Sequence, residues 1–136
     1  MFPTIRWLLA ASLVVATVLI YFPYIFVVIG RVQAGFDVAA PRALFDKLPP
    51  FAQRAVWAHE NSFETFMPFA AAVLLTLLTH VETQTVAIAS VSFVVARFLY
   101  SIFYIANIPI GRSLMFGVGT AATLTLFLQS LAALSA

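Results

Sequence analysis

Four long apolar stretches dominate this chain of 136 residues and limit what it can fold into. A helix needs about 20 mostly apolar residues to cross the hydrocarbon core of a bilayer, and each stretch reaches that length. Backbone polar groups in lipid must be paired within the segment, so such stretches are expected to be α-helices. The chain is therefore predicted to be an all-α integral membrane four-helix bundle. The predicted spans cover about residues 5–29, 55–79, 83–106 and 111–134.

The composition agrees with a membrane chain and excludes several other classes. Hydrophobic residues make up 63% of the chain and charged residues 9%, whereas about a quarter of the residues in a typical soluble domain are charged. The chain has no cysteine, so disulfides and thiolate metal sites are excluded. The two histidines have no third ligand at a suitable spacing, and no metal site is predicted. No basic tract is present that would indicate binding to nucleic acid.

The connections between the spans predict the organisation and the orientation of the chain. A long loop at about residues 31–54 joins the first two spans, and the other connections are short enough for helical hairpins. Residues 1–136 are predicted to form a single membrane domain. Lys and Arg mark cytoplasmic loops, so both termini are predicted to be non-cytoplasmic, although Arg6 weighs weakly against this orientation. The basic residues on the predicted cytoplasmic side are Arg31, Arg42, Lys47, Arg54 and Arg112.

Polar residues at helical spacing form one stripe in the second span and another in the third. Counting inward at ~1.5 Å per residue places Glu64 and Arg97 at about the same depth, and it places Asn61 at about the depth of Tyr104. Because unpaired charges in lipid are costly, Glu64 is predicted to pair with Arg97 and Asn61 with Tyr104. The second-span stripe contains Arg54, Trp57, Asn61, Glu64 and Pro68, and the third-span stripe contains Arg97, Tyr100 or Ser101, Tyr104 and Asn107.

These stripes allow two interpretations. The Glu64–Arg97 pair could serve only to fix the register of two helices. Alternatively, the hydrogen-bond donors at the predicted cytoplasmic ends of the spans outnumber the acidic residues there, which is typical of an anion-binding site. Arg112 and Ser113, at the start of the fourth span, allow a similar choice between a membrane anchor with a helix-capping hydroxyl and a functional pair. The donors concerned are Arg54, Asn61, Tyr104 and Arg112.

Residues 53–64, QRAVWAHENSFE, resemble a pattern of the MAPEG family, the membrane-associated proteins in eicosanoid and glutathione metabolism. The family pattern R-A-x-x-A-H-x-N-x-x-E near the start of the second helix corresponds here to residues 54–64. A second match is Arg97-x-x-Tyr100-x-x-x-Tyr104, followed by Arg112-Ser113, which is similar to the third helix and the start of the fourth helix in the family. Together these matches cover about residues 40–120.

The resemblance implies a homotrimer that binds reduced glutathione at its subunit interfaces near the cytoplasmic side. The implied function is that of a membrane-bound glutathione-dependent transferase or peroxidase, acting on lipophilic electrophiles or lipid hydroperoxides. A bacterial inner membrane is the expected location, with membrane lipids and a hydrophobic small molecule as further partners. Arg112 and Ser113 are the implied catalytic residues, Arg112 by supporting the thiolate. The expected glutathione-binding residues are Arg54, Asn61, Glu64, Arg97, Tyr104 and Arg112.

Two positions depart from the family, and two other functional classes stay open. Trp57 and Glu60 stand where the prostaglandin synthase branch has arginines. The cytoplasmic end of the expected site therefore has two fewer positive charges, which argues against prostaglandin synthesis. The same replacements would permit a non-catalytic scaffold or a lipid-binding trimer of the same fold. A small proton-coupled transporter could use Glu64 as its carboxylate, but the long basic loop and the predicted partner Arg97 argue against it.

Overall fold

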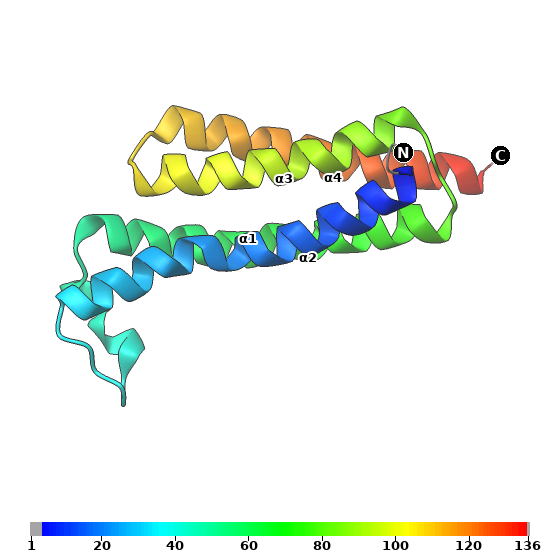
Figure 1. Cartoon of the computed structure of the whole chain (residues 1–136). Coiled ribbons are helices and arrows are strands. Elements are labelled where there is room, and N and C mark those ends of the chain that lie inside the picture. Colours follow the sequence, from blue (N-terminus) through cyan, green and yellow to red (C-terminus); the bar gives the residue numbers. More distant parts are fainter. Residues whose placement is uncertain (1–3, 136) are drawn as a thin grey trace.

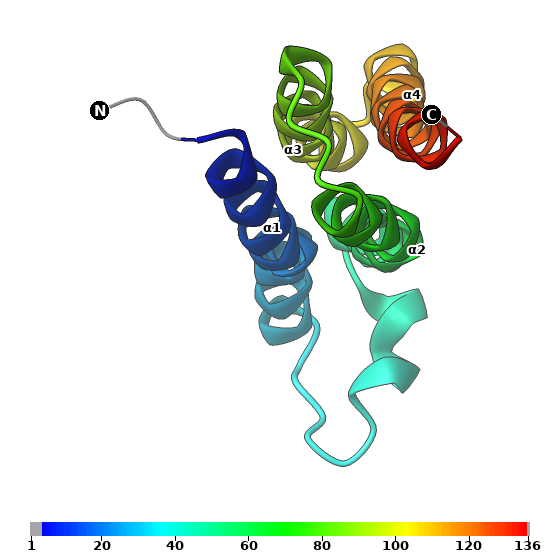
Figure 2. The ribbon, with the colours of Figure 1, turned by 90° about the vertical axis from the view of Figure 1, so that its right-hand side faces the viewer.

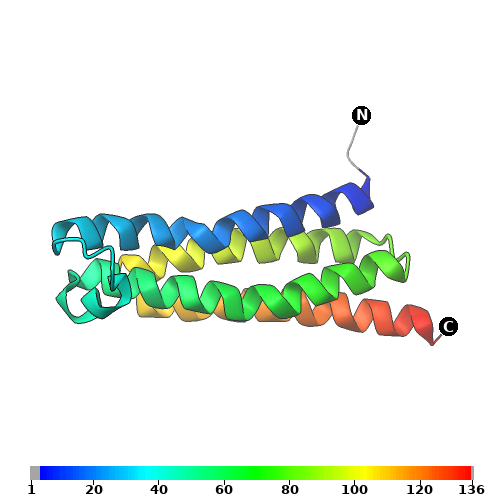
Figure 3. The same cartoon turned by 90° about the horizontal axis from the view of Figure 1, so that it is seen from below.

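The computed structural model describes residues 4–135, and it folds them into four long helices that lie side by side (Figure 1). Successive helices run in opposite directions (Figures 1 and 3). The beginning of α1 and the end of α4 therefore lie at one end of the bundle, and the connection from α1 to α2 lies at the opposite end. All four are long and apolar enough to cross a membrane, which confirms the predicted all-α membrane fold. The helices are α1 (Ile5–Gln33), α2 (Pro50–Leu78), α3 (Gln84–Ile105) and α4 (Pro109–Leu134).

Local sequence signals account for the starts of these helices. Thr4 and Thr83 precede α1 and α3, and each side chain accepts a hydrogen bond from the backbone N–H three residues further on, as N-capping residues do. Pro50 and Pro109 begin α2 and α4, where the missing N–H of proline would have no helical partner. Residues 1–3 and 136 of the predicted domain lie outside the described residues.

The connection between α1 and α2 is shorter than the loop predicted at 31–54. α1 continues to Gln33 and α2 begins at Pro50, so the connection covers residues 34–49. It contains a short 3₁₀-helix, η1 (Pro41–Lys47). Hydropathy marks only the part of a helix that lies in lipid, so it gives no signal for the polar first turns of α2.

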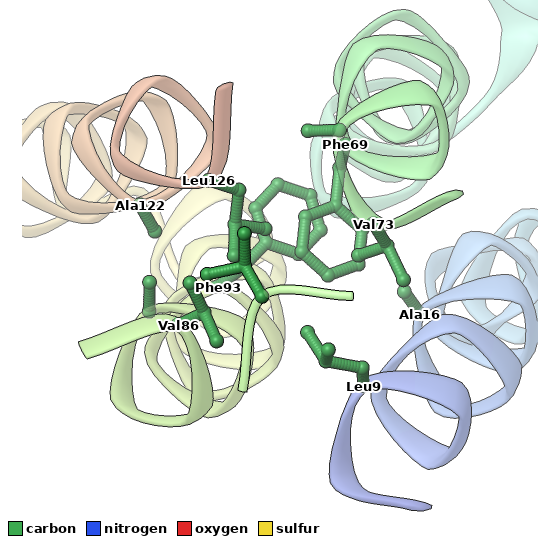
Figure 4. Packing of buried hydrophobic residues seen from close by; sticks show 11 residues of the cluster. Leu9, Ala16, Phe69, Val73, Val86, Phe93, Ala122 and Leu126 are labelled. Carbon is green, nitrogen blue, oxygen red and sulfur yellow. The ribbon is translucent and has the colours of Figure 1, made fainter. Parts of the chain in front are cut away.

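Helices α2 and α3 form the centre of the bundle, and both contact α1 and α4, which lie on opposite flanks (Figure 2). The rings of Phe69 on α2 and Phe93 on α3 stack with their centroids 3.7 Å apart and their planes at 2° (Figure 4). Leu9 from α1 and Leu126 from α4 are fully buried beside them. The charged residues of the central helices lie between the middle of the bundle and the end where α1 and α2 are connected.

Close contact between α1 and α2 near this end depends on a glycine, which gives the first prediction. A methyl group at Gly30 would overlap the Cβ of Ala52, so Gly30→Ala is expected to push the helices apart and to cost about 1–3 kcal/mol of stability. Gly117→Ala is the matched control, because nothing lies within 4 Å of a Cβ at that position. Thermal melts in one detergent should show a lower melting temperature for the Gly30 variant alone. Equal melting of both variants would contradict the contact.

Candidate functional site

Three helices bring the predicted site residues together on one face of the bundle. Because the helices are antiparallel, the first turns of α2, the last turns of α3 and the first turn of α4 lie at the same end (Figure 1). We call this the basic end, because it carries Arg31, Arg42, Lys47, Arg54 and Arg112. We call the polar face the set of Asn61 and Glu64 from α2, Arg97, Tyr100 and Tyr104 from α3, and Arg112 and Ser113 from α4.

Asn61 lies between the two residues that were predicted to pair directly. Nη2 of Arg97 donates a hydrogen bond to Oδ1 of Asn61 at 3.0 Å, and Nδ2 of Asn61 donates to Oε2 of Glu64 at 3.1 Å. The predicted Glu64–Arg97 pair and the predicted Asn61–Tyr104 pair are therefore both replaced by the chain Arg97–Asn61–Glu64. Counting residues fixes the depth of a side chain along a helix but not its direction around the axis. Arg97 is buried and Glu64 is exposed, and the side-chain amide of Asn61 connects them through these two hydrogen bonds.

Arg97 is the most deeply buried charged residue of the polar face. Its side chain is 4% exposed, and its guanidinium carbon lies 3.9 Å from the centroid of the Tyr100 ring. This contact and the bond to Asn61 offset part of the cost of removing the charge from water. Nη1 of Arg97 has no hydrogen-bond partner among the described residues. The polar face thus retains a buried donor that a bound molecule or water can satisfy.

The turn between α3 and α4 places Arg112 beside Tyr104. Asn107 adopts a left-handed conformation with φ of 60°, which asparagine tolerates better than most residues and which ends α3 abruptly. The guanidinium carbon of Arg112 then lies 4.6 Å from the centroid of the Tyr104 ring. Arg112 and Ser113 line a hollow of ≈ 280 Å³ together with Asn61, Tyr100, Tyr104 and Phe116. Both predicted catalytic residues therefore share one hollow with predicted binding residues.

This hollow continues into an apolar groove along α2, α3 and α4. The groove has a volume of ≈ 360 Å³, and Asn61, Glu64 and Arg97 form the polar part of its lining. Most of its other wall residues are apolar or carry only a hydroxyl group. They include Pro68, Phe93, Phe116, Thr120, Leu124 and Phe127. The arrangement can hold a molecule with a polar group at the basic end and a hydrocarbon part toward the middle of the bundle.

Arg54, the remaining predicted binding residue, is engaged with the backbone. Its Nε donates to the carbonyl oxygen of Ile105 at 2.9 Å, at the C-terminus of α3, where carbonyl groups lack helical partners. A cation there also interacts favourably with the negative end of the helix dipole. The structure therefore gives Arg54 a role in joining α2 to the end of α3, whatever else it contacts.

A second hollow at the basic end is lined by residues that were not predicted to form a site. It lies between α1, η1 and α2, has a volume of ≈ 660 Å³, and includes Arg31, Arg42 and His59 in its lining. Nη1 of Arg31 donates to the hydroxyl of Tyr24 at 3.0 Å. The basic character of the loop was the only signal for this hollow in the sequence, because the fold of an irregular loop leaves no periodic pattern.

His59 holds α2 against α1 in the wall of the second hollow. Its Nδ1 lies 2.6 Å from the carbonyl oxygen of Ile20. A carbonyl can only accept, so Nδ1 carries the proton and donates it to this oxygen. Among the described residues no group of three or more His, Asp or Glu side chains is placed to hold a metal ion.

Comparison with known proteins gives one match. The model of the MAPEG family matches residues 8–132, which include the whole polar face. No curated protein and no solved structure matches this chain.

Proposed function

The chain belongs to the MAPEG family, and from this premise we propose that it is a membrane-bound enzyme that uses reduced glutathione. It acts as a transferase on lipophilic electrophiles or as a peroxidase on lipid hydroperoxides. The observation that carries the proposal is the shared hollow of Arg112, Ser113, Asn61 and Tyr104. With Tyr100, which also lines it, the hollow combines a cation, three hydroxyl groups and an amide at the entrance of an apolar groove, which suits a polar thiol beside a hydrophobic substrate.

Arg112 is proposed to stabilise the thiolate of glutathione. A free thiol has a pKa near 8.5, and the thiolate is the nucleophile. Lowering that pKa by two units requires about 2.7 kcal/mol, which one guanidinium can supply in a site shielded from water. Tyr104 lies under the guanidinium of Arg112 and limits its positions, and Ser113 can donate a hydrogen bond to the sulfur from the next residue of α4.

Both reactions follow from the same thiolate. In conjugation, the sulfur forms a bond to the electrophilic carbon, and the leaving group departs or the adduct takes a proton. In peroxide reduction, the sulfur takes the terminal oxygen of the hydroperoxide, the O–O bond breaks, and the alcohol leaves with a proton. A second glutathione then converts the sulfenic acid to the disulfide and water. The apolar groove beside Glu64 and Phe116 suits substrates that enter from lipid.

A homotrimer is proposed because the polar face of one subunit is open. Glu64 and Ser113 are exposed on helices that cross the membrane, and an uncovered carboxylate within a span is costly. A neighbouring subunit can cover this face. The hollow between α1, η1 and α2 lies at the same end and carries Arg31 and Arg42, two cations suited to the carboxylates of glutathione. The proposed site is thus formed by two subunits.

The basic end is proposed to face the cytoplasm, which gives a prediction about topology. Lys and Arg in short loops are retained on the cytoplasmic side, and this end carries Arg31, Arg42, Lys47, Arg54 and Arg112. A reporter that is active only in the cytoplasm should be silent when fused to the C-terminus and active when inserted at Gly35, in the connection between α1 and α2. The opposite pattern would place the proposed glutathione site on the non-cytoplasmic side.

Binding of reduced glutathione to the purified protein tests the proposed function. Calorimetry in lipid nanodiscs should show saturable binding at millimolar concentration or below, together with the ultraviolet absorbance of a thiolate. S-methylglutathione is the control, because it retains both carboxylates but cannot form a thiolate, so it should bind without the absorbance. Absence of binding would overturn the proposal and favour the scaffold that the replacements at Trp57 and Glu60 would permit.

A further inference from the structure

The carboxylate of Glu64 has room for a further hydrogen-bond donor. Its side chain is exposed on a helix that crosses the membrane. Within residues 4–135 its only hydrogen bond comes from Nδ2 of Asn61 to Oε2, at 3.1 Å. A carboxylate offers about four acceptor positions, and a charge within a span is costly unless it is paired. Glu64 can therefore accept a donor from outside its own subunit.

Tyr21 presents a hydroxyl group at the same depth on another flank of the subunit. Its side chain is 55% exposed, and its ring centroid lies 6.1 Å from that of Phe63, the residue before Glu64. Among the described residues its hydroxyl forms no hydrogen bond, whereas a tyrosine hydroxyl removed from water usually has a partner. Tyr21 lies on α1, and Glu64 lines the groove formed by α2, α3 and α4.

The symmetry of a membrane trimer brings together residues of equal depth. All subunits have the same orientation in the bilayer, so the rotation axis is parallel to the membrane normal and changes the depth of no residue. In a closed ring, one flank of each subunit contacts a different flank of the next subunit. A neighbour can therefore reach Glu64 only with a side chain from about the same depth, which Tyr21 provides.

The other exposed side chains of α1 and α3 near this depth offer no comparable donor. In the part of the chain that the structure describes, the exposed side chains of α3 between residues 86 and 105 are all apolar. Those of α1 between residues 14 and 29 are apolar except for Thr17 and Tyr21. The hydroxyl of Thr17 donates to the carbonyl oxygen of Leu13 at 2.8 Å, so it is already bonded within its own helix.

We propose that the hydroxyl of Tyr21 in one subunit donates a hydrogen bond to the Glu64 carboxylate of the next subunit. The inference rests on the proposed homotrimer and deepens it, because it names a side chain that the neighbour contributes to the polar face. The bond extends the chain Arg97–Asn61–Glu64 across the interface. The neighbour thereby helps to hold the amide that binds Arg97, and the ring of Tyr21 covers the Glu64 carboxylate from lipid.

The chain has no cysteine, so engineered thiols can test the contact by cross-linking. Tyr21→Cys and Glu64→Cys are combined in one chain, and membranes are treated with a short bis-methanethiosulfonate whose spacer fills the room left by the two side chains. A ladder that ends at the covalent trimer is expected on a denaturing gel, because each subunit joins both neighbours. Each single variant should stay monomeric, and a ladder in either one would contradict the contact.

Val14 and Val28 provide controls that are matched in direction and differ in depth. Each is exposed and lies seven residues from Tyr21 on the same face of α1, displaced by about 10.5 Å along the helix. Paired with Glu64→Cys, Val14→Cys and Val28→Cys should each cross-link at least about tenfold more slowly than Tyr21→Cys. Equal or faster cross-linking of either control pair would overturn the proposed contact.

Tyr21→Phe tests the hydroxyl while keeping the ring. It should raise the dissociation constant of the trimer in detergent at least about tenfold, since hydrogen bonds to charged groups are the stronger ones. In a Glu64→Leu background the same change should have little effect. Thr17→Val is the control, because it removes an exposed hydroxyl bonded within its own helix, and it should leave dissociation unchanged. An equal effect of Tyr21→Phe in both backgrounds would contradict the bond.

Calorimetry with reduced glutathione on the unsubstituted protein separates this contact from the proposed enzyme. Glutathione binding together with faster cross-linking in a control pair would overturn the contact between Tyr21 and Glu64 alone. The expected cross-links without glutathione binding would overturn the proposed enzymatic function alone. A monomeric mass in nanodiscs would overturn both the contact and the proposed trimer.

Discussion

The Arg112→Ala variant is expected to lose the thiolate absorbance on addition of glutathione and to conjugate a test electrophile about 100- to 1000-fold more slowly. The guanidinium of Arg112 lies over Tyr104 in the hollow that also contains Asn61 and Ser113. It is the cation of the polar face that is best placed for a sulfur there, because Arg97 is buried and already bonded to Asn61. Without it, the bound thiol is expected to stay protonated at neutral pH.

The Arg112→Lys variant tests the positive charge at this position separately from the planar shape of the guanidinium. Lysine restores a positive charge but not the planar guanidinium that stacks on Tyr104, so partial recovery of the thiolate and of the rate is expected. Arg6→Ala is the matched control, because Arg6 is exposed at the opposite end of the bundle. The mass of the assembly should be unchanged in all three variants, since Arg112 lies at a helix entrance. A full thiolate signal in Arg112→Ala would contradict the proposed role.

The four-helix fold was predictable because hydropathy and length largely determine a membrane span. α3 and α4 begin within two residues of the predicted spans, and α1 begins where the first span was placed. The errors fall where helices leave the lipid, since α1 extends to Gln33 and α2 begins at Pro50. Polar residues there form helix outside the apolar core of the membrane, and hydropathy alone carries no signal for them.

The members of the candidate site were predictable, but the contacts among them were not. Family resemblance and helical spacing selected Asn61, Tyr104 and Arg112, and the structure places all three in one hollow. The direct pair of Glu64 with Arg97 was wrong, because the rotation of a helix about its axis depends on packing with its neighbours. The hollow that contains Arg31 and His59 was missed, since it depends on the conformation of residues 34–49.

The contact between Arg97 and Asn61 gives the last prediction. Asn61→Leu would leave the guanidinium of Arg97, 4% exposed, without its bond to Oδ1. Loss of a partner by a buried charged group is expected to cost at least about 1–3 kcal/mol. Arg97→Met removes the charge and its stacking on Tyr100. Because each single change disrupts the same contact, the double variant should be more stable than the sum of the two losses implies, by about 0.5–3 kcal/mol.

A second double-mutant cycle distinguishes the chain Arg97–Asn61–Glu64 from a direct ion pair between Glu64 and Arg97. Glu64 contacts Asn61, and Arg97 contacts the other end of the same amide, so Glu64→Gln combined with Arg97→Met should show a weaker coupling than Asn61→Leu combined with Arg97→Met. A direct Glu64–Arg97 pair requires the opposite result, with strong coupling in this cycle and weak coupling between Asn61 and Arg97. Thermal melts of the five variants and the unsubstituted protein in one detergent measure both cycles. The larger coupling therefore identifies the partner that stabilises the buried guanidinium within the bundle.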